Sequence, residues 1–90
     1  MANEVRGWQN DFRQAAIYAR LGMEALANNE LRQAIDSLLP ELARLPPATL
    51  SACTPLLTEL LDAQQRRDYS WFADLIEYRL LPLLGPLDAV

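Results

Sequence analysis

Ninety residues with a net charge of −4 describe one small acidic domain, too short for a second core. The surplus of carboxylates argues against nucleic-acid binding, which needs clustered cations to displace counterions. Leu and Ala dominate the 51% of residues that are hydrophobic, and they favour helices over sheets because they lose little side-chain freedom in a helix.

The first predicted helix covers residues 8–27. Its apolar residues follow a 3-4-3-4 spacing that places them on one face. Within that face we interpret Gly22 as a place where a neighbouring helix comes close, since glycine otherwise weakens a helix. Asn28 and Asn29 tolerate left-handed geometry and cap helices, so they predict the first break. The apolar line comprises Val5, Trp8, Phe12, Ala15, Ala19, Gly22 and Leu26.

The second predicted helix covers residues 30–45 and carries a regular apolar stripe. Pro40 interrupts it, because proline removes one backbone hydrogen bond and clashes with the preceding turn. The stripe stays in phase across Pro40, which favours a kink over a break. The stripe comprises Leu31, Ile35, Leu38, Leu42 and Leu45.

The third predicted helix covers residues 50–67, after Pro46-Pro47 has ended the second. Either Thr49 or Thr54 is its N-cap. If Thr54 caps, Pro55 takes the favoured first helical position; otherwise Pro55 lies inside the helix and kinks it.

The fourth predicted helix covers residues 69–81, and Pro82 is expected to end it. Its apolar residues wrap most of its circumference, leaving only a narrow polar line. A helix that is apolar over so wide an arc must be covered on more than one side. We therefore expect part of the cover to come from a second copy of the chain.

Together these patterns predict an all-α domain in which two antiparallel helical hairpins form a four-helix bundle, with Pro40 and Pro55 either kinking or breaking their helices. No uncharged apolar stretch approaches the ~20 residues that a membrane span needs. The single cysteine, Cys53, cannot form an internal disulfide, which favours the cytoplasm. All eight cations are Arg, which we attribute to a GC-rich bacterial genome.

Residues 18–46 resemble a single tetratricopeptide repeat. Leu21-Gly22 matches the Leu-Gly pair of the repeat's first helix, Ala34 and Leu38 match residues of its second, and Pro46 falls at the closing proline. Asn29 stands in place of the usual turn glycine. The resemblance implies an antiparallel helical hairpin.

The chain from residue 15 to 84 also resembles a group of small helical bacterial proteins, some encoded near motility or surface-secretion genes. The resemblance is carried by the segment that begins at Asp68-Tyr69 and runs through Ala73-Asp74-Leu75-Ile76-Glu77-Tyr78 to Pro82. It implies two hairpins and supplies no catalytic residues.

Few side chains here suit catalysis. The sequence has no His and no Lys, the commonest proton-transfer and Schiff-base groups. Cys53 is in phase with leucines and is expected to be a buried structural thiol. One Cys without His does not form a zinc site. Asp74 and Glu77 are interpreted as the solvated stripe of an amphipathic helix, so we expect no enzyme activity, metal or cofactor.

The predicted function is therefore protein–protein interaction, adaptor or chaperone-like, by a homodimer that binds a helix of another protein. Docking would use the Trp71–Leu75–Tyr78 line or the seam beside Gly22. The alternative is a small-ligand-binding regulatory domain, with an apolar pocket between the second and fourth predicted helices that Tyr78 and Arg79 close. The candidate interface residues are Trp8, Gly22, Tyr69, Trp71, Leu75 and Tyr78.

Overall fold

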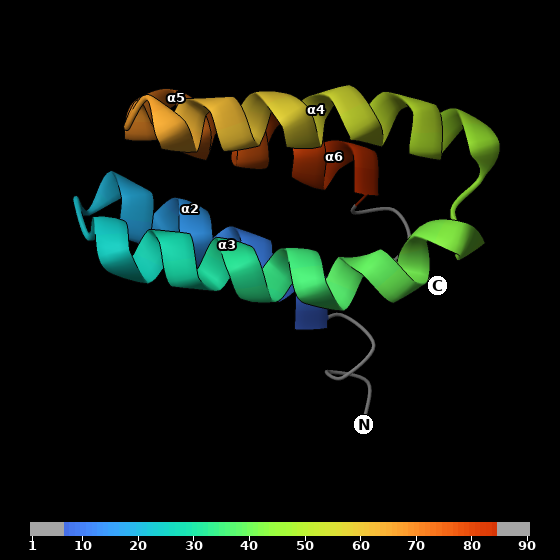
Figure 1. Cartoon of the computed structure of the whole chain (residues 1–90), viewed down its shortest axis with the longest axis horizontal. Helices are drawn as coiled ribbons and strands as arrows, with labels where there is room; N and C mark the ends of the chain where they lie inside the picture. Colours follow the sequence, from blue (N-terminus) through green and yellow to red (C-terminus); the bar gives the residue numbers. More distant parts are fainter. Residues whose placement is uncertain (1–6, 85–90) are drawn as a thin grey trace.

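A computed structural model describes residues 7–84, and every regular element in that range is helical. Two antiparallel hairpins lie in two layers, which confirms the predicted all-α fold (Figure 1). One layer holds α2 (Gly7–Arg20), α3 (Glu24–Leu38) and the 3₁₀ helix η1 (Leu39–Arg44). The other holds α4 (Pro47–Gln65) and a second helical run of α5 (Tyr69–Asp74), the π-helix η2 (Leu75–Leu80) and α6 (Leu81–Leu84).

The turn of the first hairpin lies at Leu21–Met23, so the predicted helix 8–27 and its break at Asn28-Asn29 are wrong. Gly22 has φ +77°. Its N–H donates to the Ala19 carbonyl and that of Met23 to the Tyr18 carbonyl, at 3.1 and 2.9 Å. This pair of bonds is a Schellman motif, which needs a left-handed residue at the position of Gly22. The glycine therefore ends a helix instead of admitting a neighbouring one.

The second hairpin ends α4 with the same motif but without glycine. The Arg67 N–H donates to the Gln64 carbonyl at 3.0 Å, and that of Asp68 to the Ala63 carbonyl at 2.9 Å. Arg67 occupies the left-handed position with φ 59°. Its guanidinium donates to Glu24 at 2.8 Å, so this turn is tied to the start of α3.

Pro40 ends α3 instead of kinking a longer helix. The chain continues as the 3₁₀ helix η1, with Pro40 in its first turn, so the predicted helix 30–45 is two elements. The predicted phase is nevertheless kept, because Leu38 and Leu45 are buried and Leu42 is half-buried on the same side. A proline has no N–H, and the tighter 3₁₀ pattern is a common continuation where the α-helical ladder stops.

The α4 helix runs without a break through Pro55 and begins earlier than predicted, at Pro47 instead of residue 50. Pro47 stands at the first helical position, where a missing N–H costs nothing. Neither Thr49 nor Thr54 caps the helix; the Thr54 hydroxyl donates to the Leu50 carbonyl at 3.1 Å.

The last helical run extends past Pro82 to Leu84, instead of ending at residue 81. Its centre is a π-helix, in which the Leu81 N–H donates to the Ile76 carbonyl five residues earlier. The main buried residues recur at every fourth position. On an α-helix, side chains at this spacing rotate around the helix axis by about 40° per repeat. The wider π turn offsets this drift and keeps one face buried. That face comprises Phe72, Ile76, Leu80 and Leu84.

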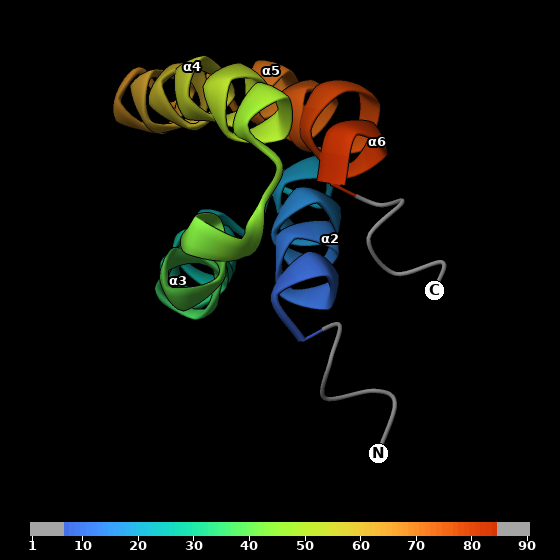
Figure 2. The same cartoon turned by 90° about the vertical axis from the view of Figure 1, so that its right-hand side faces the viewer.

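The core lies between the two layers. The α2 helix packs on α3, α5, η2 and α6, and α4 packs on α5, η2 and α6. Seen along the layers, α3 and α4 occupy the same edge of the molecule but stand apart (Figure 2). The bundle is thus tightly packed along α2 and open between α3 and α4. None of the helices within residues 7–84 is long and apolar enough to cross a membrane.

Candidate functional site

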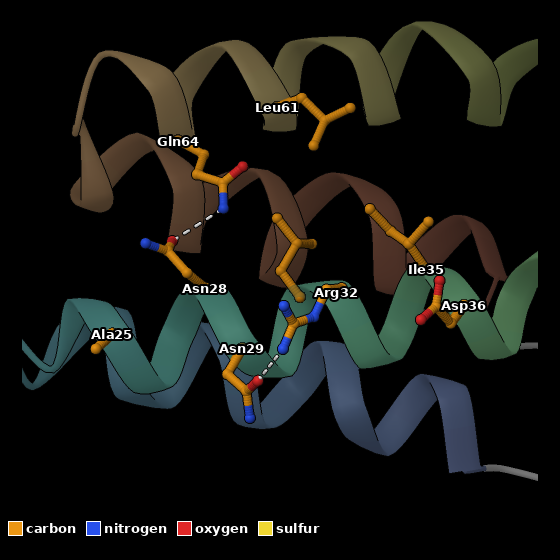
Figure 3. A pocket seen from close by; sticks show the side chains of 9 residues that line it. Ala25, Asn28, Asn29, Arg32, Ile35, Asp36, Leu61 and Gln64 are labelled. Atoms are coloured by element: carbon orange, nitrogen blue, oxygen red, sulfur yellow. Dashed lines mark hydrogen bonds between the residues drawn. The ribbon is translucent and has the colours of Figure 1, made fainter.

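A groove lies at the edge where α3 and α4 stand apart, with a volume of about 500 Å³, and it is open to solvent. Side chains of α3 point toward α4 and those of α4 point back (Figure 3). We call this surface the α3–α4 groove. It is lined by Ala25, Asn28, Asn29, Leu31, Arg32, Ile35, Asp36, Leu61 and Gln64.

The middle of the groove is apolar. Leu31 is buried at its base and Ile35 is half-buried beside it. Leu61, on the opposite wall, keeps 43% of its surface exposed. Leu61 and Ile35 point into the same gap from opposite helices (Figure 3). An apolar partner entering here would remove both side chains from water.

One end of the groove is closed by a network of amides. The Asn28 side-chain oxygen accepts hydrogen bonds from Gln64 Nε2 at 3.1 Å and from the Tyr69 hydroxyl at 2.9 Å. These bonds join α3, α4 and α5 at one point. Asn28, the expected helix break, therefore lies inside α3 and holds the groove's width at this end.

The α3 wall carries two opposite charges one turn apart. Arg32 Nη2 donates to the Asn29 side-chain oxygen at 2.6 Å (Figure 3). Within residues 7–84 neither Arg32 nor Asp36 forms an ion pair. An Arg that precedes an Asp by four residues is the less favourable order for pairing along a helix. Both charges are left on the rim of the groove.

Most of the predicted interface residues lie elsewhere. Trp8 and Leu75 are buried within the chain, so the line Trp71–Leu75–Tyr78 is no continuous exposed surface. Tyr78 is strongly exposed, at 69%. Gly22 lies in an open turn, where no heavy atom of the described residues comes within 4 Å of the point that a Cβ would occupy. This open space contradicts close helix packing at Gly22.

Tyr69 and Trp71 are half-buried against the core. The Tyr69 ring lies 5.4 Å from that of Phe72, and its hydroxyl is the one that bonds Asn28. Tyr69 is thus the predicted residue nearest to the groove, where it supports the amide network. The Arg79 guanidinium lies 5.8 Å from the Trp71 ring centre, a cation–π contact on another part of the surface.

Asp74 and Glu77 are engaged by one arginine. Arg20 Nη2 lies 2.8 Å from Asp74 Oδ1 and 2.8 Å from Glu77 Oε1. The hydrogen bonds that the Arg20 guanidinium donates, first to Glu77 and then to Asp74, raise the pKa of Arg20, which keeps the guanidinium charged. The three side chains tie α2 to the last helical run. In the part of the chain that the structure describes, no group of three Asp, Glu, Cys or His side chains is arranged to hold a metal ion.

Cys53 is fully buried in α4, as predicted. Burial in apolar surroundings raises the pKa of its thiol, because the thiolate loses hydration. The thiolate is the nucleophilic form, so this environment makes Cys53 unreactive.

The groove residues carry little signal in the sequence. Ile35 and Leu61 follow the same helical spacing as buried leucines, and no local feature separates a groove wall from a filled core. The pattern places Arg32 and Asp36 on the outer face of their helix. Their four-residue spacing in an unfavourable order for pairing is the one feature of the sequence that marks this surface.

Comparison with known proteins adds no relative to these observations: no family model, no curated protein and no solved structure matched the chain.

Proposed function

We propose that this protein is a non-enzymatic interaction module, adaptor or chaperone-like, that acts in the cytoplasm and binds a helix in the α3–α4 groove. The proposal depends mainly on the exposure of Leu61, which is 43% exposed and faces Ile35 across an open apolar gap. Helix-in-groove recognition uses apolar anchors spaced along one helical face, and such a gap between two helices suits them.

The chemistry of the other side chains supports binding over catalysis. The thiol of Cys53 is buried, and the carboxylates of Asp74 and Glu77 are both bonded to Arg20. An active site needs polar groups that converge on a substrate with perturbed pKa values. The groove instead offers an apolar centre with amides and single charges at its rim, which is the anatomy of a protein interface.

The shape of the groove favours a helix over a small molecule. Small-ligand sites enclose most of the ligand surface, whereas this groove is open to solvent. Tyr78 and Arg79, the side chains expected to close a ligand pocket, do not line it. A small-ligand-binding regulatory domain therefore has less support.

Site-specific photo-crosslinking in cells tests the proposal. A photoreactive amino acid at Leu61 is expected to give a discrete protein adduct. The same group at Ile17 is the matched control, because Ile17 is 41% exposed on α2, outside the groove. Ile35→Asp on the facing wall should remove the Leu61 adduct while far-UV circular dichroism stays unchanged. Absence of an adduct from Leu61, or equal adducts from both positions, would contradict the proposal.

A further inference from the structure

The charges of Arg32 and Asp36 at the rim of the groove form a self-complementary pattern. Arg32 and Asp36 lie one helical turn apart on α3, both exposed, and neither has an ion-pair partner within residues 7–84. The four other arginines that form ion pairs there reach a carboxylate at 2.8–3.4 Å. Other charged side chains of the described residues also lack an ion pair, Arg13 and Glu59 among them, but Arg32 and Asp36 are two opposite charges on the wall of one groove.

A two-fold axis would satisfy both charges at once. If two copies of α3 lie antiparallel with the axis between positions 32 and 36, Arg32 of each copy faces Asp36 of the other. Isologous interfaces have this reciprocity, in which one residue contacts a second and the second contacts the first. Two ion pairs then form from a single pair of residues. Charges placed in this way fix register and orientation more than they supply affinity.

Apolar side chains beside the charges supply the surface to be buried. Ile35 lies between Arg32 and Asp36 along α3 and would fall close to the axis. Leu61 projects from the opposite wall, where it would cover α3 of the second copy. Leu39, 54% exposed, lies one turn beyond Ile35 and extends the apolar line.

The face that contains α3 and α4 is large enough for a stable contact. It is the broad side of a body that measures 33 × 29 × 20 Å, and both helices lie toward the viewer in Figure 1. A specific interface buries ~800 Å² on each partner, which fits on such a face.

We infer that the helix held in the α3–α4 groove is α3 of a second copy of this chain, antiparallel, with its register fixed by reciprocal Arg32–Asp36 ion pairs. This inference rests on the proposed function, because it names the occupant of the same groove. A second copy and a helix of another protein would exclude one another there.

Charge exchange across the axis tests the inference. The variants Arg32→Glu and Asp36→Arg are each expected to weaken self-association about tenfold or more, because like charges then meet twice in the dimer. The double variant Arg32→Asp/Asp36→Arg should restore most of the lost affinity, since the charges have only changed places. The order Asp then Arg also pairs along the helix, which competes weakly with the ion pairs across the axis. Sedimentation equilibrium over a range of concentrations measures each dissociation constant.

Mixing the two single variants gives a second readout. One carries only carboxylates at the rim and the other only guanidinium groups, so an equimolar mixture should form heterodimers although each alone is weakened. The controls are Gln33→Glu and Ser37→Arg, exposed neighbours outside the groove, which should leave the dissociation constant unchanged. Thermal unfolding of every variant shows that the fold is retained.

The inference is overturned by a chain that stays monomeric up to about 1 mM, or by a dimer that neither single variant weakens or the double variant does not restore. The photo-crosslinker at Leu61 separates this inference from the proposed function. An adduct between two copies supports the inference and that part of the proposed function which places a helix in the groove. An adduct with another protein from a monomeric chain overturns the inference and leaves the proposed function standing. Absence of any adduct from Leu61 contradicts both.

Discussion

Single backbone positions decide where these helices end. Gly22 is left-handed, and no heavy atom of residues 7–84 lies within 4 Å of the point that a Cβ would occupy, so the cost of a side chain there comes from backbone conformation and not from a clash. The same turn geometry at Arg67 uses a non-glycine residue that also bonds Glu24. Both hairpins thus need a left-handed residue after the first helix. The first hairpin uses a glycine there, and the second uses an arginine that also forms an ion pair.

Gly22→Ala is accordingly expected to lower the free energy of unfolding by about 1 kcal/mol, without moving any neighbour. Chemical denaturation measures the change. Arg67→Gly is the reverse substitution at the matching turn, where relief of the left-handed backbone offsets the loss of an exposed ion pair, so a near-neutral effect is expected. A destabilisation by Arg67→Gly larger than that by Gly22→Ala would show that the ion pair, and not the backbone, dominates.

Two carboxylates, Asp11 on α2 and Glu30 on α3, have raised pKa values. Burial raises the pKa of Glu30 above its ordinary value of 4.5, and the charge of Asp11 raises it further. Burial also raises the pKa of Asp11. The folded state therefore holds these protons more tightly than the unfolded state, and their contribution to stability is lost as pH rises through the raised pKa values.

Glu30→Gln should therefore stabilise the protein at neutral pH, by a few tenths of a kcal/mol because the site is partly solvated. The gain should vanish below about pH 4, where both states are protonated. Urea denaturation across this pH range measures it. Glu59→Gln, the same change at an exposed position of α4, is the control and should show a smaller difference. An equal gain at all pH values would contradict the explanation.

At the scale of helices, periodicity predicts the number and order of the main segments but misses their local geometry. The stripe Leu31, Leu38, Leu45 continues across Pro40 as expected, yet the backbone changes to a 3₁₀ helix. Apolar spacing reports which side of a segment is buried. It does not report whether the hydrogen bonds behind that side span three, four or five residues.

The π-helix illustrates the limit most clearly. The sequence assigns Phe72, Ile76 and Leu80 to one face, and they are buried on one face. Their strict four-residue spacing is the available signal of a wider turn. Pro82, expected to end the helix, lies two residues after the last residue of the π-helix and is accommodated within the helical run.

Deleting Tyr78 together with Pro82→Ala is expected to convert this region to an uninterrupted α-helix. The deletion turns the buried 4-4-4 spacing into 4-3-4, which is α-helical, and removes only an exposed side chain. The substitution removes a proline that costs ~3 kcal/mol inside an α-helix. Thermal unfolding followed by far-UV circular dichroism should show a cooperative transition at or above the original midpoint.

The deletion without Pro82→Ala is the matched variant and should be less stable, because the turn before the proline is then α-helical and the proline ring clashes with the carbonyl four residues earlier. The explanation is that the π-helix keeps the buried residues on one face and makes room for Pro82. Loss of cooperative unfolding in the combined variant would contradict it.

At the scale of the molecule, the two layers follow from the sequence but the groove does not. Composition and stripes predict two hairpins, and the hairpins are present. Which pairs of helices meet closely depends on contacts between residues far apart in the chain. The Asn28 network with Gln64 and Tyr69, which holds one end of the groove, joins positions 36 and 41 residues apart. Local patterns carry no information on such pairings.

If a helix binds in the α3–α4 groove and on no other apolar surface, association should change the environment of the groove side chains alone. Methyl NMR of the chain at increasing concentration tests this directly, because Leu61 and Ile17 are almost equally exposed, at 43% and 41%. The methyl resonances of Leu61 and Ile35 are expected to shift with concentration while those of Ile17 stay fixed. Shifts at Ile17 with Leu61 unmoved, or no shift at either up to about 1 mM, would contradict a helix-binding groove at this edge of the bundle.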